Sequence, residues 1–179
     1  PGVFLSLLRN KPFNSGIGSA GASWFRPDPD KSMTRILIFG NSGSGKSTLA
    51  RVLSSEQSLA HLDLDGLAWE ATDPPARRPI RESARDIRRF LASNTAWVIE
   101  GCYADLLALV AEAADKAVFL NPGVDQCVAN CRLRPWEPHK YPTRKAQDDN
   151  LNMLIDWVKQ YPERKDEFSL GAHRALFEQ

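Results

Sequence analysis

A glycine-rich segment, GNSGSGKST at positions 40–48, is the feature that most constrains how this chain can fold. It has glycine at position 40, then four residues, and then glycine, lysine and serine at positions 45–47. An apolar run, ILIF at positions 36–39, precedes it, and residues that favour a helix follow it. In a chain of this length the four fixed positions arise by chance on the order of once in a hundred cases. A strand, such a loop and a helix in that order are typical of a phosphate-binding loop.

Each residue type in this loop has a physical task in binding a phosphate. Glycines allow a tight turn that brings backbone N–H groups around the phosphate, where side chains would collide with it. A helix that begins near Lys46 adds the positive end of its dipole. The Lys46 ammonium would reach the β- and γ-phosphates, and the Ser47 hydroxyl would bind Mg²⁺. The residues expected to bind ATP are therefore Gly40, Asn41, Ser42, Gly43, Ser44, Gly45, Lys46, Ser47 and Thr48.

Short apolar runs alternate with amphipathic segments along the rest of the chain, which predicts parallel strands joined by crossover helices. Strands are expected at residues 36–39, 59–63, 96–100 and 117–120. Helices are expected at residues 46–53, 80–91, 104–114, 122–131, 151–158 and 170–177. Asn121 would cap the fourth of these helices, with Pro122 in its first position. The proline-containing residues 132–145 are expected to be a loop, and residues 167–168 are at most a stub of a fifth strand.

A single domain is expected over residues 33–179, because domains commonly contain about 100–150 residues. Residues 1–32 differ, since glycine, proline, serine and asparagine recur there too often for a regular element, and we expect an irregular N-terminal extension. The net charge of +1 does not indicate a nucleic-acid or membrane partner. No apolar stretch approaches the roughly 20 residues that cross a bilayer. The three cysteines do not suggest a disulfide framework, so a cytoplasmic location is expected.

Two aspartates follow the second predicted strand, at the sheet edge where parallel α/β folds bind their ligands. One residue separates Asp63 from Asp65, so in an extended chain both side chains point to the same side. Two acids there could hold Mg²⁺ through water and accept the proton of an attacking hydroxyl group. The alternative is structural: Asp65 and Gly66 form a turn, and Asp63 caps a helix.

Further candidate site residues are Glu100, Gly101 and Arg81, of which Gly101 and Arg81 are candidates for acceptor binding. Glu100, at the end of the third strand, either faces the ligand or is a buried acid that caps the next helix. Gly101 would allow a substrate to approach the backbone closely. Arg81 opens the helix after the second strand, where it either binds a carboxylate or phosphate of the acceptor or belongs to a solvated helix face.

The loop at residues 132–145 is basic, with five lysines and arginines against one acid. Phosphoryl transfer leaves negative charge on the equatorial oxygens, and an arginine that arrives when a loop closes stabilises that charge. The loop is therefore a candidate lid. Arg132 and Arg134, at the end of the preceding helix, are the candidate catalytic arginines, whereas Lys140 is expected to be a solvated surface residue.

Four segments together resemble the adenylate-kinase-like P-loop kinases: the phosphate loop, HLDLD at 61–65, WVIEGCY at 97–103 and the arginines near 132. Within that family the pattern is most similar to shikimate-kinase-like and bacterial topology-modulation P-loop proteins, over residues 34–177. The resemblance implies a three-layer P-loop NTPase fold, with helices on both faces of a parallel sheet of strand order 2-3-1-4 and a short or absent fifth strand. It also implies an acceptor-binding region after the second strand and a lid before the last helices.

Carried over by position, the resemblance gives Asp63 a role beside magnesium and Asp65, Arg81 and Gly101 roles in acceptor binding. It makes Arg132 a lid arginine. Shikimate kinases have a run of glycines where this chain has EGCY at 100–103, and this departure argues against shikimate itself as the acceptor.

These patterns predict an ATP- and Mg²⁺-dependent kinase, that is, a transferase of phosphoryl groups to a small metabolite. Lys46, Asp65, Arg132 and Arg134 are its predicted catalytic residues. One alternative is a nucleotide-binding regulatory protein with little or no turnover. Another is a kinase that acts on a nucleic-acid end or a nucleotide sugar, which the near-neutral charge disfavours.

Overall fold

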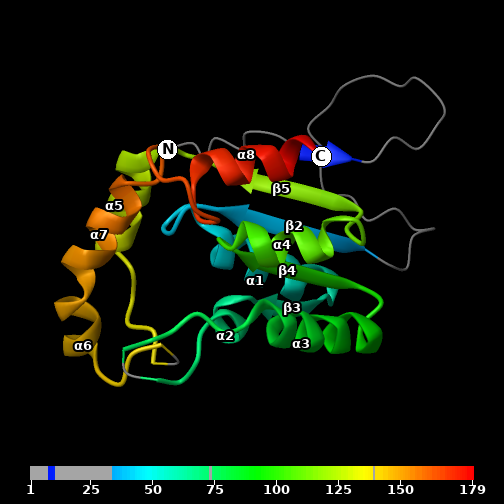
Figure 1. The fold of residues 1–179 in the computed structure, drawn as a ribbon, viewed down its shortest axis with the longest axis horizontal. Coiled ribbons are helices and arrows are strands. Elements are labelled where there is room, and N and C mark those ends of the chain that lie inside the picture. The colour runs from blue at the N-terminus through cyan, green and yellow to red at the C-terminus, as the bar shows by residue number, and fades with distance from the viewer. Residues whose placement is uncertain (1–7, 11–33, 73, 139) are drawn as a thin grey trace.

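The computed structural model describes residues 8–10, 34–72, 74–138 and 140–179, and its centre is a five-stranded sheet (Figure 1). The strands are β1 (Leu8–Asn10), β2 (Arg35–Gly40), β3 (Ala60–Asp63), β4 (Trp97–Gly101) and β5 (Lys116–Leu120), in the spatial order β1-β5-β2-β4-β3. The last four of these pair in parallel. The predicted order 2-3-1-4 is confirmed, because it is the order of β3, β4, β2 and β5.

Helices cover both faces of the sheet and its carboxyl edge. They are α1 (Lys46–Gln57), α2 (Asp65–Ala68), α3 (Ile80–Ser93), α4 (Ala104–Ala111), α5 (Val124–Arg132), α6 (Arg144–Asp149), α7 (Leu151–Lys159) and α8 (Leu170–Glu178). In Figure 1, α5, α6 and α7 stand beyond the ends of the strands, where β2 leads into the phosphate loop. This α/β arrangement is the P-loop type of fold that the sequence predicted.

Successive side chains of β2 point to opposite faces of the sheet, and they belong to two separate layers of the core. Leu37 and Phe39 pack with residues of α3, α4 and α8 on one face. Ile36 and Ile38 pack on the other face with α1, and all four side chains are buried. A strand buried on both faces requires an uninterrupted apolar run, which is what residues 36–39 supply.

The structure differs from the sequence prediction in the strand that pairs with β5 and in the residue that caps α5. At one edge, β1 pairs antiparallel with β5, although it lies within the extension predicted to be irregular; residues 1–7 and 11–33 lie outside the described residues. In agreement with the prediction of a short or absent fifth strand, no strand follows β5 along the described chain, and residues 167–168 lie in a turn. The prediction that Asn121 caps α5 is wrong: the N-cap is Gly123, with φ 92°, a backbone conformation that favours glycine, so Pro122 precedes the helix.

Two short helices were missed because their local signals are weak. Asp65–Ala68 forms a single turn, α2, where the sequence suggested only a turn. Inside the predicted loop, α6 begins at Arg144, because the Thr143 side chain accepts a hydrogen bond from the backbone N–H of Ala146. The described residues 133–138 and 140–143 form no helix or strand, as predicted.

Candidate functional site

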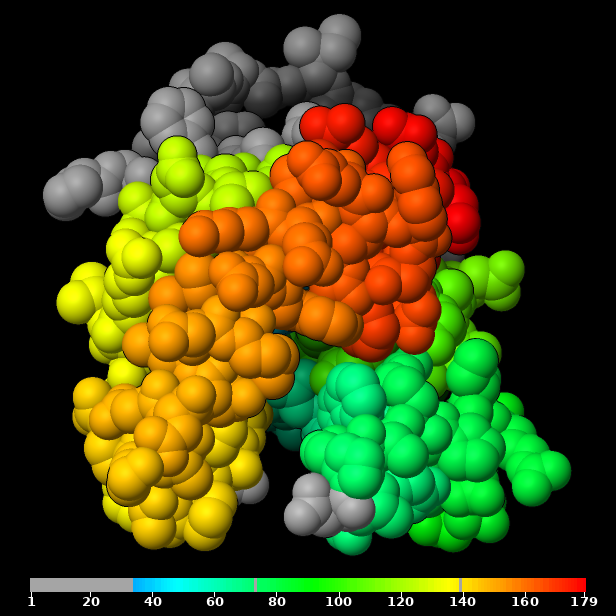
Figure 2. All heavy atoms as spheres, turned by 60° about the vertical axis from the view of Figure 1, so that its left-hand side comes forward, coloured from blue at the N-terminus to red at the C-terminus, as the bar shows by residue number. Residues whose placement is uncertain are grey.

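A cavity of about 1010 Å³ lies at the carboxyl edge of the sheet. One wall is the phosphate loop with the start of α1, and α5 and residues 133–138 form a second wall. The lining is completed by Asp65, Glu100, Cys102, Leu120, Pro122 and Lys140. The molecular surface is hollowed between the yellow and orange residues around α6 and α7 and the green residues that follow β3 (Figure 2). Parallel α/β folds bind their ligands at this edge.

Glycines shape the phosphate loop as the motif requires. At Gly43, φ is 78°, and a Cβ atom would collide with the carbonyl oxygen of Cys127 in α5. Gly45 also has a positive φ, 96°, but a Cβ there would meet nothing within 4 Å. Gly43 is therefore needed for close packing and Gly45 for its backbone conformation.

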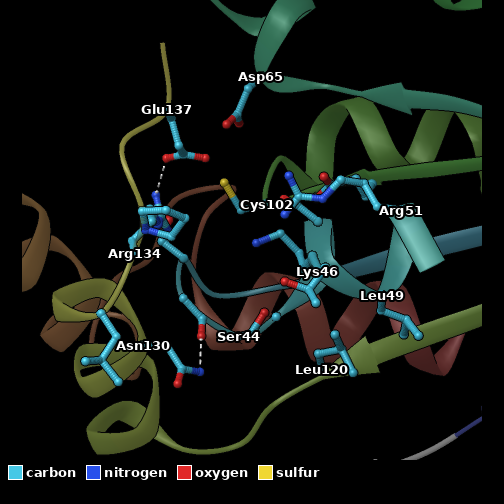
Figure 3. A pocket seen from close by; sticks show the side chains of 18 of the residues that line it. Ser44, Lys46, Leu49, Arg51, Asp65, Cys102, Leu120, Asn130, Arg134 and Glu137 are labelled. Atoms are coloured by element: carbon cyan, nitrogen blue, oxygen red, sulfur yellow. Dashed lines mark hydrogen bonds and ion pairs between the residues drawn. The ribbon is translucent and has the colours of Figure 1, made fainter. Parts of the chain in front are cut away.

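The Lys46 side chain is buried at the centre of the cavity (Figure 3). Its Nζ donates a hydrogen bond to the backbone carbonyl of Asn41, 3.0 Å away, within the same loop. The N-cap of α1 is Gly45, which makes no side-chain capping bond. Because the first N–H groups of a helix have no partner inside the helix, they remain available here to an anion. The loop thus fits a nucleotide phosphate.

Side-chain amides fix the loop to α5 and α7. Asn41 Nδ2 donates to the carbonyl of Val158 in α7 at 3.1 Å, and Asn41 Oδ1 accepts from the Ser42 N–H at 2.8 Å. Asn130 Nδ2, from α5, donates to the carbonyl of Gly43 at 2.8 Å. Sequence reasoning did not identify Asn130, because nothing in the sequence shows that α5 lies against the loop.

Asp65 is bound by two groups from distant parts of the chain. Its Oδ1 accepts a hydrogen bond from the Tyr103 hydroxyl at 2.7 Å, and its Oδ2 lies 2.6 Å from Lys140 Nζ. Asp63 Oδ1 accepts from the backbone N–H of Asp65 at 2.9 Å. The N-cap of α2 is Leu64, so Asp63 is not the helix cap that the structural alternative expected. The sequence analysis expected Lys140 to be solvated, whereas the structure pairs it with carboxylates. Its Nζ also lies 3.8 Å from Asp63 Oδ2 and 3.7 Å from Glu137 Oε1.

The pKa values of the neighbouring carboxylates of Asp63, Asp65 and Glu100 are shifted in different directions. Burial raises the pKa of Asp63, and the nearby charges of Asp65 and Glu100 raise it further against the opposing effect of Lys140. Burial also acts to raise the pKa of Asp65, but Lys140 and the Tyr103 hydrogen bond outweigh it, so the net shift is downward. Asp65 therefore stays ionised, and Asp63 is the more easily protonated of the two.

Glu100 is fully buried yet lines the cavity, and its Oε1 has no hydrogen-bond partner among the described residues. His61 Nε2 lies 3.7 Å away, beyond hydrogen-bond distance. Burial raises the pKa of Glu100, but the contact with His61, the charge of Lys46 and the hydroxyl of Ser47 together lower it. β3 and β4 pair Asp63 with Glu100 in register, which places both acids at the edge of the sheet.

These oxygen groups fit magnesium. The Ser47 hydroxyl and the carboxylates of Glu100 and Asp63 are the hard ligands that Mg²⁺ prefers. Across the described ranges, no three His, Cys, Asp or Glu side chains are grouped so that they could hold a metal by themselves. A bound Mg²⁺ would therefore complete its coordination with water and phosphate oxygens, as it commonly does in nucleotide sites.

The predicted basic residues divide into two groups. Arg134 lines the cavity, and its guanidinium lies 3.2 Å from Glu137 Oε2. Arg132, the last residue of α5, is exposed and is absent from the cavity lining, as is Arg81 on α3. Gly101 is buried behind the lining, where a Cβ atom would press on Leu64 and Tyr103. The structure thus gathers Lys46, Ser47, Asp65 and Arg134 around one cavity, with Asp63 adjoining it, and leaves Arg132, Arg81 and Gly101 outside the lining.

Two arginines that precede α3 take part in internal ion pairs. Arg77 lies 2.7 Å from Asp105 and sits over the Tyr103 ring, 4.9 Å from its centroid. Arg78 lies 2.8 Å from Asp86. Arg77 thus packs behind the tyrosine that holds Asp65.

The three cysteines are free thiols. Burial raises the pKa of Cys102, beside the cavity, to about 12 and that of Cys127 to about 11. Because a thiol with so high a pKa remains protonated, neither residue has the reactivity of a nucleophile. No helix in the described part of the chain has the length and apolar character needed to span a membrane.

Comparison with known proteins shows similarity of structure alone. No family model and no curated protein matches the chain. Shikimate kinase from Bacteroides thetaiotaomicron superimposes with a TM-score of 0.40 and 18% identity, over 82% of this chain and 95% of that one. A chain of the Pnkp1/Rnl/Hen1 RNA repair complex superimposes with a TM-score of 0.44 and 16% identity, over 80% of this chain and 50% of that one. An uncharacterized protein from Eubacterium ventriosum ATCC 27560 superimposes with a TM-score of 0.40 and 15% identity, over 74% of this chain and 80% of that one. The case for function therefore rests on the cavity.

Proposed function

We propose that this protein is an ATP- and Mg²⁺-dependent phosphotransferase that acts on a small hydroxylated acceptor. One observation carries the proposal: a phosphate loop with a buried lysine faces, across a single cavity, a carboxylate that is held ionised. The phosphate loop with the start of α1, the phosphate wall, suits a triphosphate. The side formed by Asp65 with Tyr103 and Lys140, the acceptor wall, suits a hydroxyl group, so both partners of a phosphoryl transfer would meet between the two.

The phosphate wall would bind and orient the nucleotide. The N–H groups at the start of α1 and the Lys46 ammonium would hold the phosphates, with Lys46 exchanging its bond to Asn41 for one to phosphate oxygen. Ser47 and Glu100 would hold Mg²⁺, and Asp63 would act from the neighbouring strand. When bound, ATP supplies the transferable phosphoryl group and Mg²⁺ screens its charge.

The acceptor wall would position the hydroxyl group. Asp65 accepts hydrogen bonds from fixed directions, since Tyr103 and Lys140 already orient its carboxylate. Because the pKa of Asp65 is lowered, this residue is a weak base, and orientation of the hydroxyl is its main task. Arg134, rather than the exposed Arg132, is the lid arginine placed to stabilise charge on the transferred group.

The direct test is Mg²⁺-dependent ADP release by the purified chain over a panel of hydroxylated metabolites. Wild type should bind ATP saturably and release ADP with at least one acceptor. Lys46→Ala should do neither, whereas Lys159→Ala, a change of an exposed lysine on α7, should behave as wild type. Tight ATP binding without turnover on any acceptor would favour the regulatory alternative. Absence of saturable ATP binding would refute both functions.

A further inference from the structure

The Tyr103 hydroxyl joins two residues, Asp65 in the cavity lining and Trp69 outside it. It donates a hydrogen bond to Asp65 Oδ1 at 2.7 Å and accepts one from Trp69 Nε1 at 2.8 Å. Asp65 is the first residue of α2, Trp69 directly follows that helix, and Tyr103 is the N-cap of α4. The two bonds form a relay from Trp69 through Tyr103 to Asp65.

The chemistry of the indole fixes the direction of both bonds. An indole N–H can donate a hydrogen bond but cannot accept one. The single proton of the Tyr103 hydroxyl therefore cannot point to Trp69, and it points to Asp65. A hydroxyl that accepts one hydrogen bond becomes a stronger donor in the next, because bonds in a chain polarise one another. Trp69 thus orients the Tyr103 hydroxyl and strengthens its bond to the carboxylate.

The indole of Trp69 is itself held in place. The backbone of Trp69 forms an antiparallel bridge with Arg77, whose guanidinium donates to the Ala68 carbonyl at 3.1 Å. The same guanidinium lies over two rings, 5.6 Å from the centroid of Trp69 and 4.9 Å from that of Tyr103, where a cation attracts both aromatic faces. Phe168 packs edge-on against Tyr103, with 5.3 Å between the centroids. The fold therefore sets the positions of the N–H and the hydroxyl before a ligand binds.

Under the proposed function, on which this inference rests, Asp65 orients the hydroxyl group of the acceptor. That task needs a carboxylate whose own direction is fixed, because a small displacement of the reacting groups lowers the rate strongly. We infer that Trp69 is a positioning residue of the acceptor wall, which acts on Asp65 through the Tyr103 hydroxyl. Lys140 holds the other oxygen of this carboxylate from the loop at residues 132–145, and the relay supplies an anchor from the body of the domain.

The test is a double-mutant cycle on kcat, measured as ADP release with an acceptor from the metabolite panel that supports turnover. Tyr103→Phe keeps the ring and removes both hydrogen bonds, so it should lower kcat by about tenfold. Trp69→Phe removes the N–H but leaves the Tyr103 hydroxyl beside Asp65, so it should lower kcat by about threefold. The double variant should be no slower than Tyr103→Phe, because without the hydroxyl the indole has no path to Asp65. The dissociation constant of ATP should stay unchanged in all three variants.

A second measurement needs no acceptor. The Nε1–H resonance of Trp69 in the NMR spectrum, identified by its loss in Trp69→Phe, should move in Asp65→Asn. The reason is that a neutral amide accepts the Tyr103 proton less strongly than a carboxylate does. Asp148→Asn, on the exposed face of α6, should leave the resonance in place. A resonance that does not respond to Asp65→Asn would overturn the relay.

The outcomes separate this inference from the proposed function. Losses that multiply in the double variant, to about thirtyfold, would show that the two residues act independently, and they would overturn the role of Trp69 while leaving the proposed function in place. Failure of wild type to release ADP with every acceptor would overturn the proposed function and the role of Trp69 with it.

Trp157→Phe is the matched control, because this indole also packs against Phe168 but lies outside the relay, and the change should leave kcat unchanged. A loss in Trp157→Phe equal to that in Trp69→Phe would assign the effect to aromatic packing and overturn the relay. Because Trp69 is 37% exposed, Trp69→Phe should fold, and a thermal melt checks this.

Discussion

The two walls of the cavity are held by different interactions. Lys46, Asn41 and Ser44 in the phosphate loop are all buried, and backbone groups and neutral amides hold the loop against α5 and α7. On the acceptor wall, the side chains of Asp65 and Lys140 are 35% and 24% exposed, and their ion pair joins positions 75 residues apart. Neutral buried contacts are insensitive to pH and salt, whereas a partly exposed ion pair responds to both. The phosphate wall is thus preformed, and the acceptor wall can adjust to its ligand.

The largest expected effect is on the phosphate wall. Lys46→Ala should reduce turnover by at least about a hundredfold, because it removes the ammonium that would contact the transferred phosphate. Its fold should survive, since the Asn41 carbonyl still accepts the Ser44 N–H at 3.2 Å. Steady-state ADP release and a thermal melt measure the two effects. Retained activity would contradict the assignment of the phosphate site.

A change on the acceptor wall should separate catalysis from nucleotide binding. Asp65→Asn should lower kcat by roughly a hundredfold, because the hydroxyl of the acceptor loses its charged partner. The dissociation constant of ATP should change by less than about threefold, since the phosphate loop does not depend on Asp65. Asp148→Asn, on the exposed face of α6, is the matched control. Equal losses in kcat and ATP affinity would remove the distinction between the walls.

Lys140 should set the pKa of Asp65 and so the pH dependence of kcat. In wild type the pKa of Asp65 is lowered below 3.8 and that of Lys140 is raised above 10.5, so both groups are charged between about pH 4 and 10. In Lys140→Met the burial of Asp65 is offset only by the weaker effects of Tyr103 and Lys46, and the pKa of Asp65 should rise by about one unit or more. The acidic limb of the kcat profile should move to higher pH by the same amount.

Lys145→Met is the matched control for that profile, because Lys145 is an exposed lysine that pairs with Asp149 in its own helix. An acidic limb that stays in place when Lys140 is removed would show that the ion pair does not govern Asp65. A limb that moves equally in both variants would point to overall charge instead.

The smallest expected effect is on stability. The pKa of Asp63 is raised, so the folded protein binds a proton there more readily than the unfolded chain, and ionisation of Asp63 costs stability as pH rises above about 4. Asp63→Asn should therefore raise the melting temperature at pH 7 by roughly 2–4 °C and weaken Mg²⁺-dependent ATP binding. The gain in melting temperature should shrink near pH 4. A lower melting temperature at pH 7 would contradict the repulsion inferred between the carboxylates.

Helix phase explains why Arg134, and not Arg132, reaches the cavity. Cys127 and Cys131 are buried on the inner face of α5, so the next residue, Arg132, points outward. Arg134 lies three residues after Cys131, and its backbone N–H bonds to the Cys131 carbonyl, which continues the inner stripe past the helix end. The spacing of the cysteines already contained this signal, but the sequence interpretation kept both arginines as candidates, and the resemblance singled out Arg132.

The sequence by itself determined the phosphate wall and the order of the main strands and helices. Local rules govern both: positive φ angles demand glycine, and a strand buried on two faces demands an unbroken apolar run. Only the tertiary structure decided that Lys140 pairs with Asp65, that Asn130 holds Gly43, and that Glu100 is buried beside Ser47. These contacts join side chains far apart in the chain, and their distances depend on how the strands are ordered and how the lid loop returns across the edge of the sheet.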